Sequence, residues 1–232
     1  MPVTKLVLLP GMDGTGELFR DFVAALPEGT DTVAVHYPGD RRLRYPGLLE
    51  FVRAAAPEDK PFCLVAESFS TPLAILYAAT NPPNLKGIVL CAGFVTSPVW
   101  GWRRTLALAL AQFIFWLPLP RFFIEMFLAG PGASSALVSA VQAASSWVEP
   151  EIMAGRARDV LTCDVRAEMA KVNVPILYLQ AAQDKMVGPV SLEVARSIKP
   201  EMTVVVDGPH LLFQREPVLS AEVVMKFVQG LA

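Results

Sequence analysis

Short, nearly continuous apolar runs alternate with amphipathic segments along most of the chain. Each run is rich in Leu, Val and Ile and is bounded by turn residues, which is typical of strands buried on both faces of a sheet. The predicted strands cover residues 6–9, 32–35, 61–66, 86–92, 175–179 and 202–206. Helices are predicted between them, at about 18–26, 48–52, 71–81, 165–171, 190–198 and 217–231. This alternation predicts an α/β fold, with a mostly parallel sheet of about six strands and helices on both faces.

The alternation stops between the fourth and fifth predicted strands. Residues 94–162 contain no convincing strand and are rich in Ala, Leu, Phe and Trp. We therefore expect a mainly helical cap or lid at 94–162, inserted after the fourth strand into a core made of 1–93 and 163–232.

The cap contains an apolar run at 105–119. A membrane-spanning helix needs about 20 apolar residues, and Pro118 and Pro120 cut this run short. We expect a lid helix over an apolar pocket; transient contact with a membrane interface and a dimer contact are the alternatives. The candidate substrate-binding residues, which could equally serve only to pack the lid, are Trp100, Trp102, Phe113 and Trp116.

Composition narrows the function classes. The formal charge of −2 over 232 residues gives no electrostatic case for binding nucleic acid, which would call for a basic patch or stripe. We expect no metal site, because the three cysteines lack C-x-x-C spacing and the chain has only two histidines. We also expect no cofactor. The first apolar run is too short for a secretory signal, so a cytoplasmic protein is predicted. Oligomeric state is left open.

A candidate nucleophile stands where the third predicted strand meets a helix, in Ala66-Glu67-Ser68-Phe69-Ser70. A serine at the apex of a strand, sharp turn and helix has its hydroxyl lifted clear of the backbone, as in a nucleophile elbow. The usual signature is Gly-x-Ser-x-Gly, and Ala66 and Ser70 replace the two glycines with other small residues. Ser70 is either a tolerated small residue or a hydroxyl that tunes the site.

Serine needs a base, and the base needs an orienting group. In folds with such an elbow the acid and then the histidine follow the serine along the chain, so His210 is the candidate base, whereas His36 is expected to be structural. Asp184 follows the fifth strand after a short polar loop and is the candidate acid. Its rivals are Asp207, in the loop of the histidine itself, and Asp164, which is read as a helix N-cap.

The glycine-rich loop after the first strand, Gly11-Met12-Asp13-Gly14-Thr15-Gly16, is expected to form an oxyanion hole. The backbone N–H groups of Met12 and Phe69 would bind the oxyanion, since Phe69 directly follows the serine. Dinucleotide binding is disfavoured because Phe19 stands where a third glycine would be required.

Together these segments resemble serine hydrolases of the α/β-hydrolase superfamily, of carboxylesterase or lipase type. The resemblance covers the core, about two thirds of the chain, with Pro10 in place of the histidine usual before the first-loop glycine. It implies a triad of Ser68, Asp184 and His210 that cleaves small to medium hydrophobic carboxylic esters through an acyl-enzyme. A thioesterase, an acyltransferase or a carbon–carbon hydrolase would use the same residues. A non-catalytic protein that binds an apolar ligand is the alternative of another class.

Overall fold

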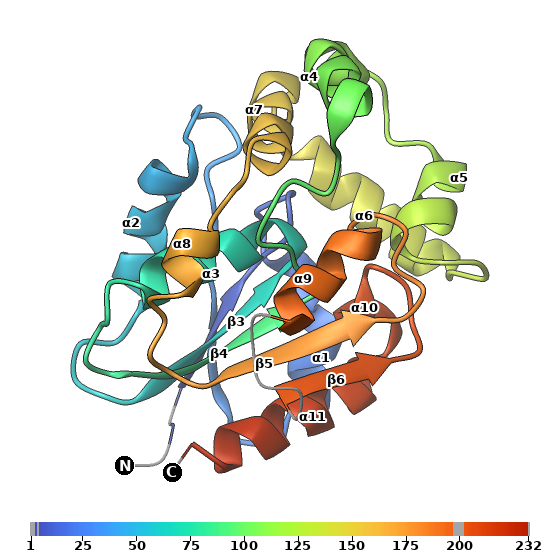
Figure 1. Cartoon of the computed structure of the whole chain (residues 1–232). Helices are drawn as coiled ribbons and strands as arrows, with labels where there is room; N and C mark the ends of the chain where they lie inside the picture. The colour runs from blue at the N-terminus through green and yellow to red at the C-terminus, as the bar shows by residue number, and fades with distance from the viewer. Residues whose placement is uncertain (1–2, 4, 197–201, 232) are drawn as a thin grey trace.

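The computed structural model describes residues 3, 5–196 and 202–231. Its centre is a six-stranded parallel sheet, which confirms the predicted mostly parallel sheet of about six strands. The strand order is β2-β1-β3-β4-β5-β6 (Figure 1). The strands are β1 (Lys5–Leu9), β2 (Asp31–Ala34), β3 (Phe62–Glu67), β4 (Leu85–Cys91), β5 (Ile176–Ala181) and β6 (Thr203–Val206). The strand order reverses between β1 and β3, so the loops after these two strands meet at the edge where open α/β sheets build their sites.

Helices cover both faces of the sheet because successive side chains of each strand point to opposite faces. Val7 and Leu9 of β1 belong to one buried cluster, and Leu6 and Leu8 belong to the other. The first face is covered by α2 (Tyr45–Ala55), α3 (Thr71–Ala78), α8 (Arg166–Met169) and α9 (Ser191–Arg196). The second face is covered by α1 (Arg20–Ala25), α10 (Leu212–Arg215) and α11 (Pro217–Gln229). Residues 197–201, which hold the end of the helix predicted at 190–198, lie outside the described part.

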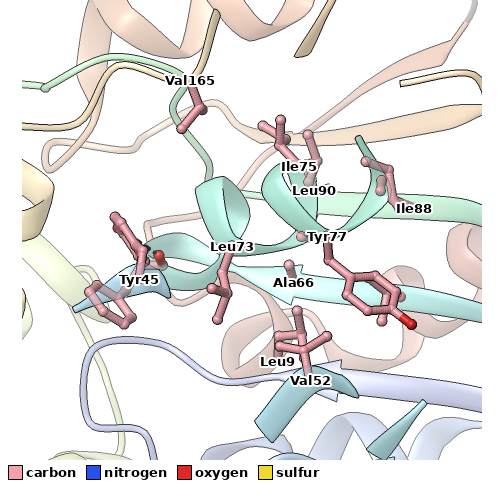
Figure 2. Packing of buried hydrophobic residues seen from close by; sticks show 14 of the residues in the cluster. Leu9, Tyr45, Val52, Ala66, Leu73, Ile75, Tyr77, Ile88, Leu90 and Val165 are labelled. Atoms are coloured by element: carbon pink, nitrogen blue, oxygen red, sulfur yellow. Dashed lines mark hydrogen bonds between the residues drawn. The ribbon is translucent and has the colours of Figure 1, made fainter. Parts of the chain in front are cut away.

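Helix α3 is embedded in the core directly after the elbow. It is apolar on nearly all sides, which is typical of a fully buried helix, and Leu73 and Ile75 are fully buried. Figure 2 shows Leu73 in the same cluster as Leu9, Val52 and Ala66. Packing on both sides therefore fixes the turn between β3 and α3.

The segment between β4 and β5 is mainly helical, as predicted. It contains α4 (Gly101–Ile114), α5 (Arg121–Phe123) with a following π-helical turn (Ile124–Leu128), α6 (Ser135–Ser146) and α7 (Pro150–Leu161). These helices gather at the top and right of the view in Figure 1. Phe94 and Val95, at the start of the insertion, are buried with the sheet, and the domain division at 94 and 162 stays a prediction. Within the described residues, none of the helices has the length and apolarity needed to cross a bilayer.

Candidate active site

Ser68 lies at the apex of a sharp turn between β3 and α3. Its φ is +48°, a left-handed conformation that is uncommon for any residue with a side chain and that persists only where the surroundings enforce it. The buried strand ending at Glu67 and the buried helix beginning at Thr71 provide that constraint. Ser68 remains partly exposed at the carboxyl edge of the sheet.

Three loops bring Ser68, His210 and Asp184 into one hydrogen-bonded series. The Oγ of Ser68 is 2.7 Å from Nε2 of His210, and Nδ1 of His210 is 2.7 Å from Oδ2 of Asp184. An ionised carboxylate only accepts hydrogen bonds, so Nδ1 carries the imidazole proton. Nε2 of His210 is then free to accept the proton of the Ser68 hydroxyl.

The electrostatics of the pair favour an ionised Asp184. Burial opposes its charge, but His210 and the backbone N–H groups of Val187 and Met186, at 3.1 and 2.8 Å from Oδ1, outweigh it, so the pKa of Asp184 is lowered. For His210, burial likewise disfavours the charged form, yet the Asp184 carboxylate outweighs it and raises the pKa of the imidazole. The site therefore stabilises an imidazolium beside the serine.

The two alternative acids and the second histidine of the chain lie outside this hydrogen-bonded series. Asp207 is exposed and accepts a hydrogen bond from Gln183 at 2.7 Å. Asp164 is exposed and pairs with the guanidinium of Arg166 at 2.7 Å. His36 is also exposed, and its Nδ1 hydrogen-bonds the carbonyl of Thr15 at 3.0 Å.

The first loop is held in one conformation by its own hydrogen bonds. The carbonyl of Gly11 accepts from the N–H of Gly14 at 3.1 Å. Because C=O and N–H point in opposite directions across a trans peptide, this bond also sets the direction of the Met12 N–H. Oδ1 of Asp13 accepts from the backbone N–H of Thr15 at 2.9 Å, which closes the next turn.

A buried arginine from the insertion completes this loop. Arg156 of α7 is 1% exposed. Its Nη1 donates to the carbonyls of Met12 and Asp13, both at 2.8 Å, and its Nη2 donates to the carbonyl of Pro38 at 3.0 Å. Gly14 has a φ of +73°, and a Cβ there would lie 2.7 Å from Nη1 of Arg156. The sequence gives no indication of this role for Arg156, because an arginine within a helix carries no signal for such a contact.

Ser70, at the position where the elbow signature has its second glycine, joins the elbow to the end of β1. Its buried hydroxyl donates to the carbonyl of Pro10. That bond uses its only proton, so the hydroxyl of Tyr37, 2.9 Å away, donates to Oγ of Ser70. The Ser70 hydroxyl thus makes structural hydrogen bonds beneath the turn. It does not belong to the Ser68–His210–Asp184 series.

Glu67, beside the serine, is a buried carboxyl group with little hydrogen-bonding support. Oε2 accepts a bond from Nε2 of Gln214 at 3.3 Å, and Oε1 has no partner among the described residues. Burial is the main cause that raises the pKa of Glu67 to about 7, although His210 and Gln214 act in the opposite direction.

The predicted substrate-binding residues of the insertion lie on its surface. Trp100, Trp102, Phe113 and Trp116 are each more than 60% exposed, and their contact with substrate stays a prediction. A hollow of about 490 Å³ includes Trp100 and Arg104 in its wall but none of the Ser68, His210 and Asp184 side chains.

Apolar side chains of the insertion contact two residues beside the site, Met12 and Leu211. Val148, Ile152 and Met153 form a buried cluster on which Met12 packs. On the other side, Leu211, next to His210, belongs to a buried cluster of the insertion, and its N–H donates to the carbonyl of Leu128 at 2.9 Å. In the described part of the chain, no three His, Cys, Asp or Glu side chains converge as metal ligands would.

A parallel sheet with a serine elbow and a Ser–His–Asp series at its carboxyl edge is the architecture of an α/β hydrolase. The sequence profile of the alpha/beta hydrolase family matches residues 6–223, so the chain belongs to that family. A search of curated proteins found no significant match.

Solved structures of low sequence identity share the fold. A hydrolase from Oleispira antarctica is 14% identical with a TM-score of 0.82, covering 97% of this chain and 91% of that one. A bromoperoxidase from Bacillus anthracis is 15% identical with a TM-score of 0.84, at coverages of 97% and 92%. An enol-lactonase from Burkholderia xenovorans is 17% identical with a TM-score of 0.72, at coverages of 98% and 92%. The family match supports an enzyme of the α/β-hydrolase type, and these neighbours support the fold.

Proposed function

We propose that this enzyme hydrolyses uncharged carboxylic esters through an acyl-enzyme on Ser68. The observation that carries the proposal is the continuous series from Ser68 Oγ through both ring nitrogens of His210 to Asp184, with 2.7 Å at each contact. A serine hydroxyl hydrogen-bonded to a base that is itself oriented by a carboxylate is the arrangement that activates serine for attack on a carbonyl carbon.

In the first half-reaction, Ser68 Oγ bonds to the ester carbonyl carbon while its proton passes to Nε2 of His210. The oxyanion accepts hydrogen bonds from the N–H groups of Met12 and Phe69. Asp184 stabilises the imidazolium and keeps its orientation. The carbon–oxygen bond to the alcohol then breaks, and His210 returns the proton to the leaving oxygen.

In the second half-reaction, water attacks the acyl-enzyme and His210 takes its proton. Collapse of the tetrahedral intermediate releases the acid and returns that proton to Ser68. The two N–H donors serve both steps, and each such donor contributes about 2.7–4 kcal/mol to lowering the barrier. No cofactor takes part in these steps.

The proposed substrates are small to medium hydrophobic esters. The apolar cluster of Val148, Ile152 and Met153 packs on the loop that carries the Met12 N–H. A charged group on the substrate near this cluster would lose hydration without a partner, whereas an alkyl or aryl group would gain contacts.

The test is an acyl-chain series of p-nitrophenyl esters and matching thioesters, assayed with wild type, His210→Ala and the exposed-histidine control His36→Ala. We expect turnover of esters that falls by about 10³-fold or more in His210→Ala and is unchanged in His36→Ala. Faster turnover of thioesters than of matched esters would instead favour a thioesterase. Equal activity in wild type and His210→Ala, or tight binding of a fatty ligand without turnover of any ester, would overturn the proposal.

A further inference from the structure

Large apolar side chains cover the outward side of α4 and the turn that follows it. Six of them, which we call the α4 surface, are between 41% and 72% exposed: Trp102, Leu106, Leu110, Phe113, Trp116 and Leu117. Monomeric proteins rarely leave so many neighbouring large apolar side chains in water, and such patches mark interaction surfaces.

The spacing shows that this exposure belongs to one face of the helix. Trp102, Leu106, Leu110 and Phe113 follow one another at intervals of four, four and three residues, which places them in one stripe. Ala111 is on the opposite side and is 3% exposed. Helix α4 is thus apolar on the side that packs on the protein and also on the side left to solvent, which is typical of a helix that meets a second apolar phase.

Tryptophan placement gives the same indication. The chain has four tryptophans, and all of them lie between residues 100 and 147 with exposures of 63% to 74%. Trp100 and Trp116 flank α4, and Trp102 lies in its first turn. Tryptophan is enriched where proteins meet the headgroup region of a bilayer, because its ring is apolar and its N–H is polar.

The charges around the α4 surface favour an anionic partner. No Asp or Glu occurs between residues 68 and 124, and Arg103 and Arg104 stand at one end of α4. Arg121, beyond the other end, pairs with Glu125 at 2.8 Å, so the positive charge at this surface comes mainly from Arg103 and Arg104. All three arginines are exposed. A second copy of the chain docked on this surface would bring arginines near arginines, so charge complementarity favours anionic lipid over self-association.

We propose that the α4 surface docks on the surface of a lipid bilayer that carries anionic headgroups. Helix α4 has 14 residues, about 21 Å at 1.5 Å per residue, which is shorter than the roughly 30 Å hydrocarbon core. The helix therefore lies in the plane of the interface, with the stripe from Trp102 to Phe113 in the acyl boundary and the arginines at the headgroups. This docking goes beyond ester hydrolysis and does not depend on it.

The test is co-sedimentation of the full chain with large vesicles, combined with tryptophan emission. Vesicles of phosphatidylcholine alone are compared with vesicles containing about 30 mol% phosphatidylglycerol. We expect wild type to sediment with the anionic vesicles and its emission to shift to shorter wavelength. We expect the double variant Trp102→Ser/Phe113→Ser to bind at least about tenfold more weakly, and Arg103→Gln/Arg104→Gln to lose most of the preference for anionic vesicles.

The matched control is Val218→Ser/Leu219→Ser, which changes two exposed apolar residues of α11, at the opposite end of the molecule in Figure 1. It should bind vesicles as wild type does, and circular dichroism should show that all variants are folded. Absence of vesicle binding by wild type, or equal binding by Trp102→Ser/Phe113→Ser, would overturn the proposal. A dimer in light scattering that this variant dissociates, without vesicle binding, would assign the surface to self-association instead. Equal binding of both vesicle types would overturn the anionic preference.

Discussion

The guanidinium of Arg156, on helix α7 of the insertion, donates a hydrogen bond of 2.8 Å to the carbonyl of Met12, in the loop after β1. The same nitrogen bonds the carbonyl of Asp13, so one buried side chain fixes two successive peptide groups of the loop. A residue 144 positions further along the chain thereby sets the conformation of the proposed oxyanion hole. Preorganised donors of this kind need no reorganisation during the reaction.

Replacing Arg156 by Met should therefore impair both stability and rate. The carbonyls of Met12, Asp13 and Pro38 would lose their donor, and we expect the free energy of unfolding to fall by about 2–4 kcal/mol. We expect kcat to fall about tenfold or more, with a smaller change in KM, because the loss acts on the oxyanion donors. Urea unfolding and steady-state ester kinetics measure the two effects, and Arg20→Met, at an exposed arginine, is the control. A folded Arg156→Met protein with wild-type kcat would show that the loop keeps its conformation without this contact.

The Tyr37–Ser70–Pro10 chain should contribute to stability and leave the nucleophile intact. Ser70→Ala and Tyr37→Phe should each lower the free energy of unfolding by about 1–2 kcal/mol, because each removes a buried hydrogen bond. The double variant should lose less than the sum, since the two hydroxyls share one bond. Ser146→Ala, at an exposed hydroxyl, should change stability by less than about 0.5 kcal/mol. Strict additivity in the double-mutant cycle would argue against the shared bond.

Glu67 should make the protein less stable as the pH rises. Its pKa in the folded chain is raised from 4.5 to about 7, so the folded state holds a proton that the unfolded state releases. Stability should decline between about pH 4.5 and about 7, by an amount on the order of 3 kcal/mol at most.

Glu67→Gln keeps the shape and removes the titration, so its stability relative to wild type should improve from pH 4.5 to pH 8. Urea unfolding of both proteins at the two pH values measures this difference. Glu50→Gln, at an exposed carboxyl group, is the control and should not alter the pH dependence. Parallel curves for Glu67→Gln and wild type would mean that folding does not raise the pKa of Glu67.

The Asp184–His210 contact predicts the acid limb of the pH–activity profile. His210 must be neutral to act as a base, and its pKa is raised above 6.5, so kcat/KM should fall as the pH drops through that raised pKa. Asp184→Asn removes the charge that raises it, leaving burial to lower it, and the acid limb should move to lower pH. The same change should reduce kcat by about 10⁴-fold, because the imidazole loses its orientation. If the acid limb of Asp184→Asn had the same pKa as that of wild type, Asp184 would not be the group that raises the pKa of His210.

Much of the fold was predictable because the strands are continuous apolar runs whose two faces are both buried. The order of Ser68, Asp184 and His210 along the chain also predicted which side chains would meet, since loops after parallel strands share one edge of the sheet. The role of Arg156 was not predictable, because its contacts depend on how the insertion folds back over the first loop. The exposure of the aromatic residues of α4 was likewise not predictable, because hydrophobicity alone does not distinguish the inner side of an insertion from its outer side. Their predicted contact with substrate stays a prediction.

Trapping with a fluorophosphonate tests whether Ser68 is the nucleophile. Intact-mass and peptide mass spectrometry should show one adduct per chain, located on Ser68. The adduct should be absent from Ser68→Ala and present in Ser70→Ala, whose replaced hydroxyl is engaged with Pro10. An adduct that persists in Ser68→Ala, or that disappears in a folded Ser70→Ala protein, would show that Ser68 is not the nucleophile.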